Sequence, residues 1–179
     1  MSKSFIISGS GGQGVISLGN ALATIFMLND LFVSLCSSYG AEMRGGNVNC
    51  EVNVSDREIL CVQNDKVDYV IALSQSAFEQ FVSKVKKNGI IIVNSSLAKI
   101  EKTREDIKYI FAPLTQEAAN LGNIKTANSI ALGILSGILG CFSIENVRFA
   151  FEKLLKGKND LVQKNIDAYM IGFNYNKEQ

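Results

Sequence analysis

The stretch that decides the fold is Ser4–Val15, which reads SFIISGSGGQGV. It opens with Phe5–Ser8, a short apolar run typical of a buried strand, and the uncharged segment Gly14–Leu28 has the length of a helix. The turn between them contains Gly9, Gly11, Gly12, Gln13 and Gly14. A glycine-rich turn that opens a helix presents backbone N–H groups to a phosphate, so the stretch predicts a Rossmann-like first βα turn.

Further apolar runs predict five more strands, and helix-length segments separate several of them. The predicted strands are Phe32–Ser37, Asn47–Val54, Tyr69–Leu73, Ile90–Asn94 and Tyr109–Ala112, and the predicted helices are Ser76–Val85, Leu97–Asp106 and most of the chain from Thr115 on. Such alternation is typical of βαβ units and a parallel sheet. In the strand at Asn47, valine and cysteine alternate with polar residues, as in a half-solvated antiparallel strand. We therefore expect a three-layer α/β fold with a mostly parallel, mixed sheet and a helical C-terminal third.

Two long segments contain no charged residue, one between Ser4 and Asn29 and one between Thr126 and Ile144. The second carries glycines in the G-x-x-x-G spacing that is also found in transmembrane helices. Its strongly apolar core is about 13 residues long, and about 20 are needed to span a bilayer, so we expect a helix buried in protein. Either its glycines let another element approach closely, or a partner subunit covers its outer face. The second alternative predicts that an isolated copy forms homo-oligomers through these helices.

The composition excludes several classes of protein. With 179 residues, 47% of them hydrophobic, and a net charge of +1, the chain can form a globular domain but has no charge excess for binding nucleic acid or an anionic membrane. Histidine is absent, and Cys36, Cys50, Cys61 and Cys141 are too scattered for a zinc or iron–sulfur site. The residues after Met1 lack the pattern of a signal peptide, so we expect reduced cysteines and a cytoplasmic location.

A second glycine-rich cluster follows the strand that begins at Phe32. It contains Tyr39, Glu42, Arg44, Gly45 and Gly46. Ligand-binding loops gather at the carboxyl ends of parallel strands, and an arginine there can bind a carboxylate or phosphate through two hydrogen bonds. The alternative is a surface ion pair between Glu42 and Arg44, with glycines that only make the turn.

The first glycine cluster is compatible with more than one function. The spacing Gly9-x-Gly11-x-x-Gly14 matches dinucleotide-binding folds, but these place an acid after the second strand, and here that strand ends in Ser38 and Tyr39. No Lys-Ser or Lys-Thr follows the turn, which excludes a nucleotide-hydrolysing P-loop. The turn therefore either binds another phosphate-bearing ligand or is purely structural. A stand-alone nucleotide- or phosphate-binding module and an NAD(P)-dependent dehydrogenase remain alternatives, and the missing acid counts against the second.

The two clusters together resemble the gamma subunit of the 2-oxoacid:ferredoxin oxidoreductases, enzymes that oxidise pyruvate, 2-oxoglutarate, branched-chain 2-oxoacids or indolepyruvate. The matching motifs are Gly9-x-Gly11-Gly12-Gln13-Gly14-Val15 and Tyr39-Gly-x-Glu42-x-Arg44-Gly-Gly46. Weaker landmarks lie at Asp68–Leu73, Gly89–Ser95, Ala118–Gly122, Asn128–Gly133 and Asn165–Gly172. The resemblance covers nearly the whole chain and implies a single gamma domain over residues 1–179.

The resemblance also implies a non-catalytic subunit of a hetero-oligomeric enzyme. The complex would turn a 2-oxoacid and coenzyme A into acyl-coenzyme A, carbon dioxide and reduced ferredoxin. Thiamine diphosphate and iron–sulfur clusters would belong to alpha, beta and delta-type ferredoxin subunits, while this chain would complete the complex and shape the coenzyme A entry. The residues expected to approach a ligand or partner are Gly9, Gly11, Gly12, Gln13, Gly14, Tyr39, Glu42, Arg44, Gly45 and Gly46.

Overall fold

The computed structural model describes residues 2–40, 46–59, 64–98, 101–156 and 158–175. At its centre is a six-stranded sheet with the order β2-β3-β1-β4-β5-β6. The strands are β1 (Ser2–Ser10), β2 (Phe32–Tyr39), β3 (Asn47–Ser55), β4 (Val67–Ala72), β5 (Val85–Asn94) and β6 (Lys108–Ala112). Neighbours among β1, β4, β5 and β6 are parallel, whereas β3 runs antiparallel to both β1 and β2. The expected α/β fold with a mixed, mostly parallel sheet is confirmed, including the antiparallel strand at Asn47.

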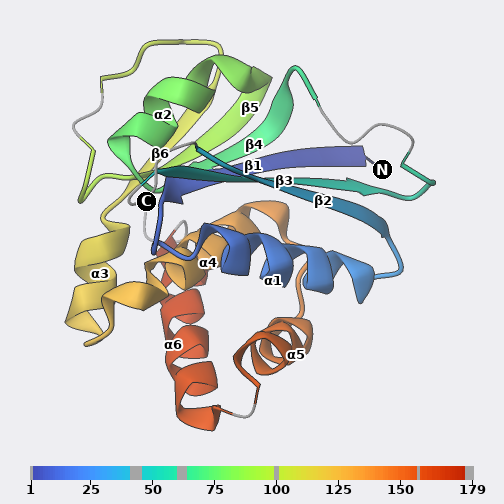
Figure 1. Ribbon diagram of the computed structural model, residues 1–179, viewed down its shortest axis with the longest axis vertical. Helices are drawn as coiled ribbons and strands as arrows, with labels where there is room; N and C mark the ends of the chain where they lie inside the picture. The colour runs from blue at the N-terminus through green and yellow to red at the C-terminus, as the bar shows by residue number, and fades with distance from the viewer. Residues whose placement is uncertain (1, 41–45, 60–63, 99–100, 157, 176–179) are drawn as a thin grey trace.

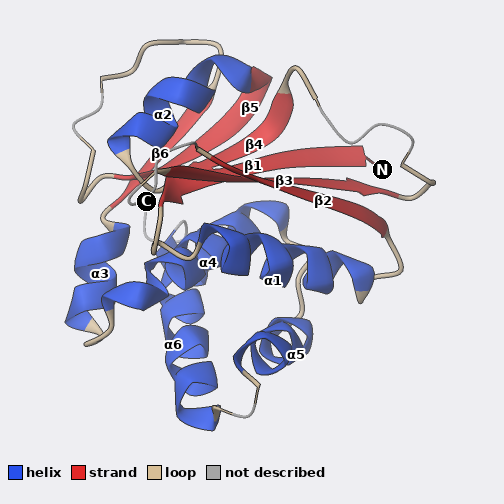
Figure 2. Cartoon of the chain, viewed as in Figure 1, coloured by secondary structure: helices blue, strands red, loops and turns tan. Residues whose placement is uncertain are grey.

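Helices lie on both sides of this sheet (Figures 1 and 2). They are α1 (Val15–Met27), α2 (Gln75–Phe81), α3 (Leu114–Asn120), α4 (Ala127–Leu139), α5 (Ile144–Leu155) and α6 (Asn159–Tyr175), with 3-10 turns η1 (Val82–Lys84) and η2 (Ile124–Thr126). Helix α2 covers one face, and α1 packs on the opposite face with α5 and α6 further from the sheet (Figure 1). Within the described residues, no helix combines the length and apolarity needed to cross a bilayer.

The burial of the strands follows from their residue patterns. Three successive residues of β1, Phe5, Ile6 and Ile7, are buried because their side chains alternate between two covered faces. In β3 only one face is apolar, and its Cys50 and Val52 are buried in the core cluster that includes α1. The alternation in the sequence therefore marks the part of the sheet that has helices on one side only.

The helix expected at Leu97–Asp106 is wrong, because the described residues of this segment contain no helix. Arg104 provides the physical reason. Its guanidinium donates hydrogen bonds to the carbonyls of Val82 and Val85, at 2.9 and 2.8 Å, and forms an ion pair with Asp106. These contacts hold the segment against the end of α2 and the start of β5. Helix α2 also ends before the predicted limit, because β5 already begins at Val85.

The chain itself buries the two uncharged helices. Every residue of α4 from Asn128 to Ser136 is buried, and α1 buries most of its apolar residues. Helix α6 packs along α4, and α5 packs against α1. Of the two alternatives, the structure therefore supports the first, in which another element approaches at the glycines, because the C-terminal helices supply the second covered face. Exposed apolar side chains remain at the end of α1, where Met27 and Leu28 lie.

Two glycines let α4 and α6 touch through their backbones. A Cβ atom on Gly133 would lie 2.0 Å from the carbonyl oxygen of Tyr169, and one on Gly172 would lie 1.9 Å from the carbonyl oxygen of Ile130. Any side chain at either position would push the helices apart. Gly133 thus has the expected role of admitting a neighbouring helix, whereas Gly137, one turn further along α4, is exposed.

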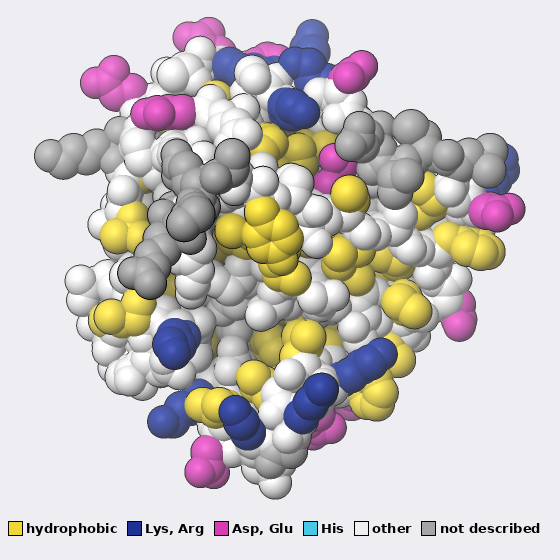
Figure 3. Space-filling view, in the orientation of Figure 1, with side chains coloured by type: hydrophobic (Ala, Val, Ile, Leu, Met, Phe, Trp, Pro, Cys, Tyr) yellow, Lys and Arg dark blue, Asp and Glu magenta, His cyan; other side chains and the backbone are white. Residues whose placement is uncertain are grey.

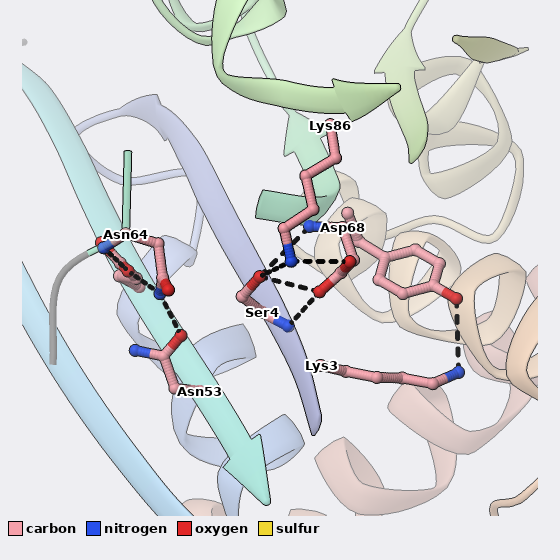
Figure 4. Close-up of polar contacts among 8 residues, drawn as sticks. Lys3, Ser4, Asn53, Asn64, Asp68 and Lys86 are labelled. Carbon is pink, nitrogen blue, oxygen red and sulfur yellow. Dashed lines mark hydrogen bonds and ion pairs between the residues drawn. The ribbon is translucent and has the colours of Figure 1, made fainter. Parts of the chain in front are cut away.

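A polar cluster joins the amino ends of β1, β4 and β5 (Figure 4). The Asp68 carboxylate accepts hydrogen bonds from the main-chain N–H and the hydroxyl of Ser4, each 2.8 Å long, and from the Lys86 ammonium at 2.9 Å. Burial opposes ionisation of Asp68, but the hydrogen bonds from Lys86 and Ser4 outweigh it and lower the pKa of this carboxyl. The cluster lies at the edge of the sheet opposite the glycine turn.

We expect Gly133→Ala to destabilise the fold by about 2 kcal/mol or more, because the added methyl group has no room between α4 and α6. Gly137→Ala is the matched control: it makes the same change in the same helix at an exposed position, where alanine is the better helix former. Urea unfolding followed by circular dichroism measures both free energies. Equal stability of the two variants would contradict the backbone contact.

The Asp68 cluster predicts a stability that depends on pH. Because the pKa of Asp68 is lowered by folding, its contribution is present above the unfolded pKa of about 3.9 and is lost as the pH falls through the folded pKa. Asp68→Asn should therefore melt below the wild type at neutral pH, and the two melting temperatures should converge in acid. Lys86→Met removes one partner only and should show a smaller loss. A gap between wild type and Asp68→Asn that stays constant with pH would count against this account.

Candidate functional site

The turn between β1 and α1 is held by the side chain of Gln13. Its amide oxygen accepts a hydrogen bond from the Ser10 N–H at 2.6 Å, and its amide nitrogen donates to the Leu73 carbonyl at 3.0 Å. A Cβ atom on Gly9 would lie 2.5 Å from that amide oxygen, so the side chain can fold back only over a glycine. Gln13 therefore joins the end of β1 to the end of β4 and fixes the path of the turn.

The turn delivers the N-terminus of α1 without a side-chain cap. Gly12 and Gly14 have φ angles of 92° and 74°, a region that costs other residues conformational energy. Gly14 is the N-cap of α1, and it brings no side-chain oxygen to the amides of the first turn, which also contains no acidic residue. These amides and the positive end of the helix dipole suit an anion. Asn128 of α4 donates a hydrogen bond to the Gly14 carbonyl at 3.2 Å and so fixes the start of the helix.

The structure brings one end of the second cluster to the glycine turn. Gly46 is buried, and its carbonyl accepts a hydrogen bond from the Gly11 N–H at 3.2 Å. Tyr39 ends β2 with 70% of its surface exposed. Glu42, Arg44 and Gly45 lie outside the described residues. Gly46 thus meets the first cluster at the carboxyl edge of the sheet, and the binding of a ligand there stays a prediction.

Sequence reasoning missed several polar groups at the same edge. Asn94, at the end of β5, donates hydrogen bonds to the Leu73 carbonyl and to Thr115, at 3.3 and 2.8 Å. The side-chain oxygen of Gln75, at the start of α2, is buried without a hydrogen-bond partner among the described residues. An acceptor of this kind is costly unless a donor reaches it in the working protein. The signal for both is a polar residue near the end of an apolar run, since Asn94 is the last residue of β5 and Gln75 lies two positions after Leu73.

A pocket of about 430 Å³ lies beside the start of α1, on the side of the sheet where α4, α5 and α6 pack. Apolar side chains line one part of it, namely Leu18, Phe151, Leu154, Leu155 and Leu161, and polar groups line the rest, namely Ser17, Asn123, Lys125, Thr126, Asn128, Ser129 and Asn165. Lys125 is the charged side chain in this lining. Exposed lysines of α5, α6 and the segment between them lie among the exposed acids Glu145, Glu152, Asp160 and Asp167, and dark blue and magenta side chains both appear over the lower part of the face in Figure 3. A pocket of this kind suits a ligand with an apolar portion and a negative charge.

No three histidine, cysteine, aspartate or glutamate side chains in the described segments gather where they could hold a metal ion. Burial, together with the neighbouring Cys36, raises the pKa of the Cys50 thiol to about 11, so this thiol stays protonated at neutral pH. Its sulfur packs against Gly19 of α1, which gives it a structural role.

Comparison with known proteins identifies the family. The profile described as "Pyruvate ferredoxin/flavodoxin oxidoreductase" matches residues 4–175. The chain belongs to the pyruvate ferredoxin/flavodoxin oxidoreductase family. It is 34% identical to the 2-oxoglutarate synthase subunit KorC of Archaeoglobus fulgidus, over 93% of this chain and 84% of that one. It is 30% identical to the ketoisovalerate oxidoreductase subunit VorA of Methanothermobacter marburgensis, over 93% of this chain and 35% of VorA.

Solved structures share the fold. The gamma subunit of the keto/oxoacid ferredoxin oxidoreductase from Geobacter sulfurreducens superposes with a TM-score of 0.81 and 26% identity, and the match covers 96% of each chain. The 2-oxoglutarate:ferredoxin oxidoreductase of Magnetococcus marinus gives a TM-score of 0.88 at 24% identity, covering 99% of this chain and 31% of that one. The chain thus spans about a third of some family members and nearly the full length of others.

The family landmarks in the sequence acquire physical explanations from the structure. Asn128 holds the start of α1, and Asn165 accepts a hydrogen bond from the Ser129 hydroxyl at 2.6 Å. Gly133 and Gly172 form the contact between α4 and α6. Asn128 therefore positions the glycine turn, and the other three residues hold α4 and α6 together.

Two glycines of the turn differ in a way that can be measured. Gly12→Ala should lower the free energy of unfolding by about 1–2 kcal/mol, because alanine is strained at a φ of 92°. Gly11→Ala is the matched control, since its Cβ would meet nothing closer than the Gly46 carbonyl oxygen at 4.0 Å. Chemical denaturation of both variants tests this. A Gly11→Ala variant that loses as much stability as Gly12→Ala would contradict the geometry of the turn.

Proposed function

We propose that this chain is the gamma subunit of a 2-oxoacid:ferredoxin oxidoreductase complex. The complex oxidises a 2-oxoacid with coenzyme A to acyl-coenzyme A and carbon dioxide and reduces ferredoxin. The observation that carries this proposal is the end-to-end match, at 96% of both chains, with a protein described as the gamma subunit of such an enzyme. The match to most of the length of KorC supports it independently.

In this proposal the chain contains no catalytic residue. Its residues bind coenzyme A or the facing subunit and hold it in position. Alpha, beta and delta-type subunits hold the thiamine diphosphate and the iron–sulfur clusters, and the complex works in the cytoplasm. The two glycine clusters shape the entry of coenzyme A, which supplies the thiol that accepts the acyl group. Arg44 and the Rossmann-like turn at Gly9–Gly14 approach its phosphates or the facing subunit. The Gln75 oxygen, which has no hydrogen-bond partner among the described residues, accepts a hydrogen bond from an N–H or O–H group of the facing subunit.

The residues present fit a phosphate group on physical grounds. The first turn of α1 contains no acidic residue, and Gly14 contributes no side chain that would occupy its amides. Lys125 lines the adjacent pocket and adds a positive charge. The apolar part of that pocket suits an aliphatic portion of the same ligand.

The alternative of an NAD-dependent enzyme is disfavoured by the sheet order. Dinucleotide-binding folds place the second strand beside the first, so that an acid at its end reaches the ribose. Here β3 lies between β1 and β2, which puts the end of β2 about 10 Å from β1, two strand spacings away. The last residue of β2 is moreover Tyr39, and the described acid nearest in sequence, Asp30, precedes the strand.

We expect the isolated chain to show no oxidation of pyruvate, 2-oxoglutarate or ketoisovalerate with coenzyme A, thiamine diphosphate and a dye acceptor. Activity should appear when the alpha, beta and delta-type subunits are added, because they contribute the cofactors. Full activity from those subunits without this chain would contradict its assignment as a required subunit. Turnover by the chain alone would contradict its non-catalytic role.

A calorimetric titration of the chain with NAD and NADP separates the proposal from its alternatives. The missing ribose ligand predicts no measurable binding. Micromolar affinity for either nucleotide would favour the stand-alone binding module or the dehydrogenase.

A further inference from the structure

In the part of the chain that the structure describes, the outer edge of β2 is open. β2 is the terminal strand of the sheet, and among the described residues nothing pairs with its outer side. Its sequence, FVSLCSSY, contains neither a charged residue nor a proline in eight positions. Soluble proteins usually protect such an edge with lysine, proline or a bulge, because its free N–H and C=O groups can pair with another strand.

The hydrogen bonds to β3 determine which groups of β2 face outward. The Gly40 N–H donates to the Asn47 carbonyl at 2.8 Å, and these residues lie opposite each other when the β2–β3 register is continued. In an antiparallel pair every second residue is bonded to its opposite, so the even-numbered residues of β2 bond to β3. Its odd-numbered residues, Val33, Leu35, Ser37 and Tyr39, therefore direct their main-chain groups to the open edge.

Exposed apolar side chains lie at both ends of this edge. Met27 and Phe32, which are 60% and 52% exposed, lie near its start, and Tyr39, 70% exposed, lies at its end. An antiparallel partner strand brings opposite ends together, so a copy of the same strand covers both apolar ends at once. No charge on the strand opposes such self-pairing.

We propose that two copies of this chain associate by antiparallel pairing of their β2 strands about a two-fold axis at Cys36. In this register Val33 pairs with Tyr39 of the second copy, Leu35 pairs with its Ser37, and each Cys36 faces the other. All outward main-chain groups of the four odd-numbered residues are then satisfied. Tyr39 packs on Val33, an aromatic and β-branched pair that is favourable across strands. The two sheets become one continuous twelve-stranded sheet, twice the six strands of one copy.

The proposed pairing of the β2 strands predicts that a disulfide can form between the two Cys36 residues at the two-fold axis. Cys36 would occupy a position without direct main-chain bonds to its opposite, where Cα atoms lie about 4.5 Å apart, within the range that a disulfide can bridge. Cys36 is exposed, whereas Cys50 is buried with a pKa of about 11 and does not compete for the oxidant. A variant with Cys61→Ser and Cys141→Ser therefore reports on Cys36. Copper–phenanthroline should convert it to a covalent dimer, and adding Cys36→Ser should abolish the product.

Sedimentation velocity of the full chain measures the association itself. We expect the reduced wild type to form a dimer, and Cys36→Lys to raise the dimer dissociation constant about tenfold or more, because it puts two ammonium groups face to face. Cys36→Ser is the neutral control and should dimerise like the wild type. Ser37→Pro removes one outward N–H and should weaken the dimer, whereas Ser37→Ala should not.

A wild type that stays monomeric at every concentration would overturn the proposal, as would a dimer that survives both Cys36→Lys and Ser37→Pro. Circular dichroism of each variant shows that the fold persists, and the disulfide experiment tests the register if a variant fails to fold. The failure of these tests would leave the gamma-subunit assignment untouched, because that assignment is tested by reconstituted activity.

Discussion

The amide of Gln13 is the contact on which the candidate site depends. By bonding to the Ser10 N–H and to the Leu73 carbonyl, it joins the ends of two neighbouring parallel strands and leaves one path for the chain into α1. Gly9 is constrained by the same contact, since any side chain there would collide with the amide oxygen. The second cluster then meets a turn that is already fixed, through the bond between Gly11 and Gly46. One side chain thus couples the first strand, the first helix and the edge where the clusters gather.

Much of the sheet was predictable, because strands covered on both faces leave continuous apolar runs and β3 leaves an alternating one. The failures have identifiable physical causes. The segment before Asp106 has the composition of a helix, yet Arg104 holds it through two carbonyls that belong to distant parts of the chain. The uncharged α4 suggested a partner subunit, because the sequence does not reveal that Gly133 and Gly172 bring α6 into backbone contact with it. Both errors concern contacts between residues far apart in the sequence, which a local sequence pattern does not reveal.

The glycines of the candidate site could be predicted from the sequence, whereas the roles of its asparagines and of Gln75 could not. Glycines near a turn mark positive φ angles, as at Gly12 and Gly14, and close approaches, as at Gly9 near the end of β1. Asparagine and glutamine are harder to interpret, because they suit turns, caps and buried networks equally well. Asn94, Asn128 and Gln75 acquire meaning only from the strand and helix ends that surround them. The end of β2 at Tyr39 instead of an acid disfavours a dinucleotide site, and the sheet order supplies the geometric reason why an acid at that position would have little to reach.

The contact between α4 and α6 has a consequence for the synthesis of the chain. Helix α4 has no charged residue and is buried along most of its length, and the backbone that covers it, at Gly172, is made some thirty residues after the helix ends. A ribosome that has just released α4 therefore holds a nascent chain with an uncovered apolar helix, and this state lasts until α6 has emerged. Such intermediates are prone to aggregate and are typical clients of chaperones. The fold thus places the greatest risk of misassembly in the interval between the synthesis of α4 and that of α6, when the strands of the sheet have already been made.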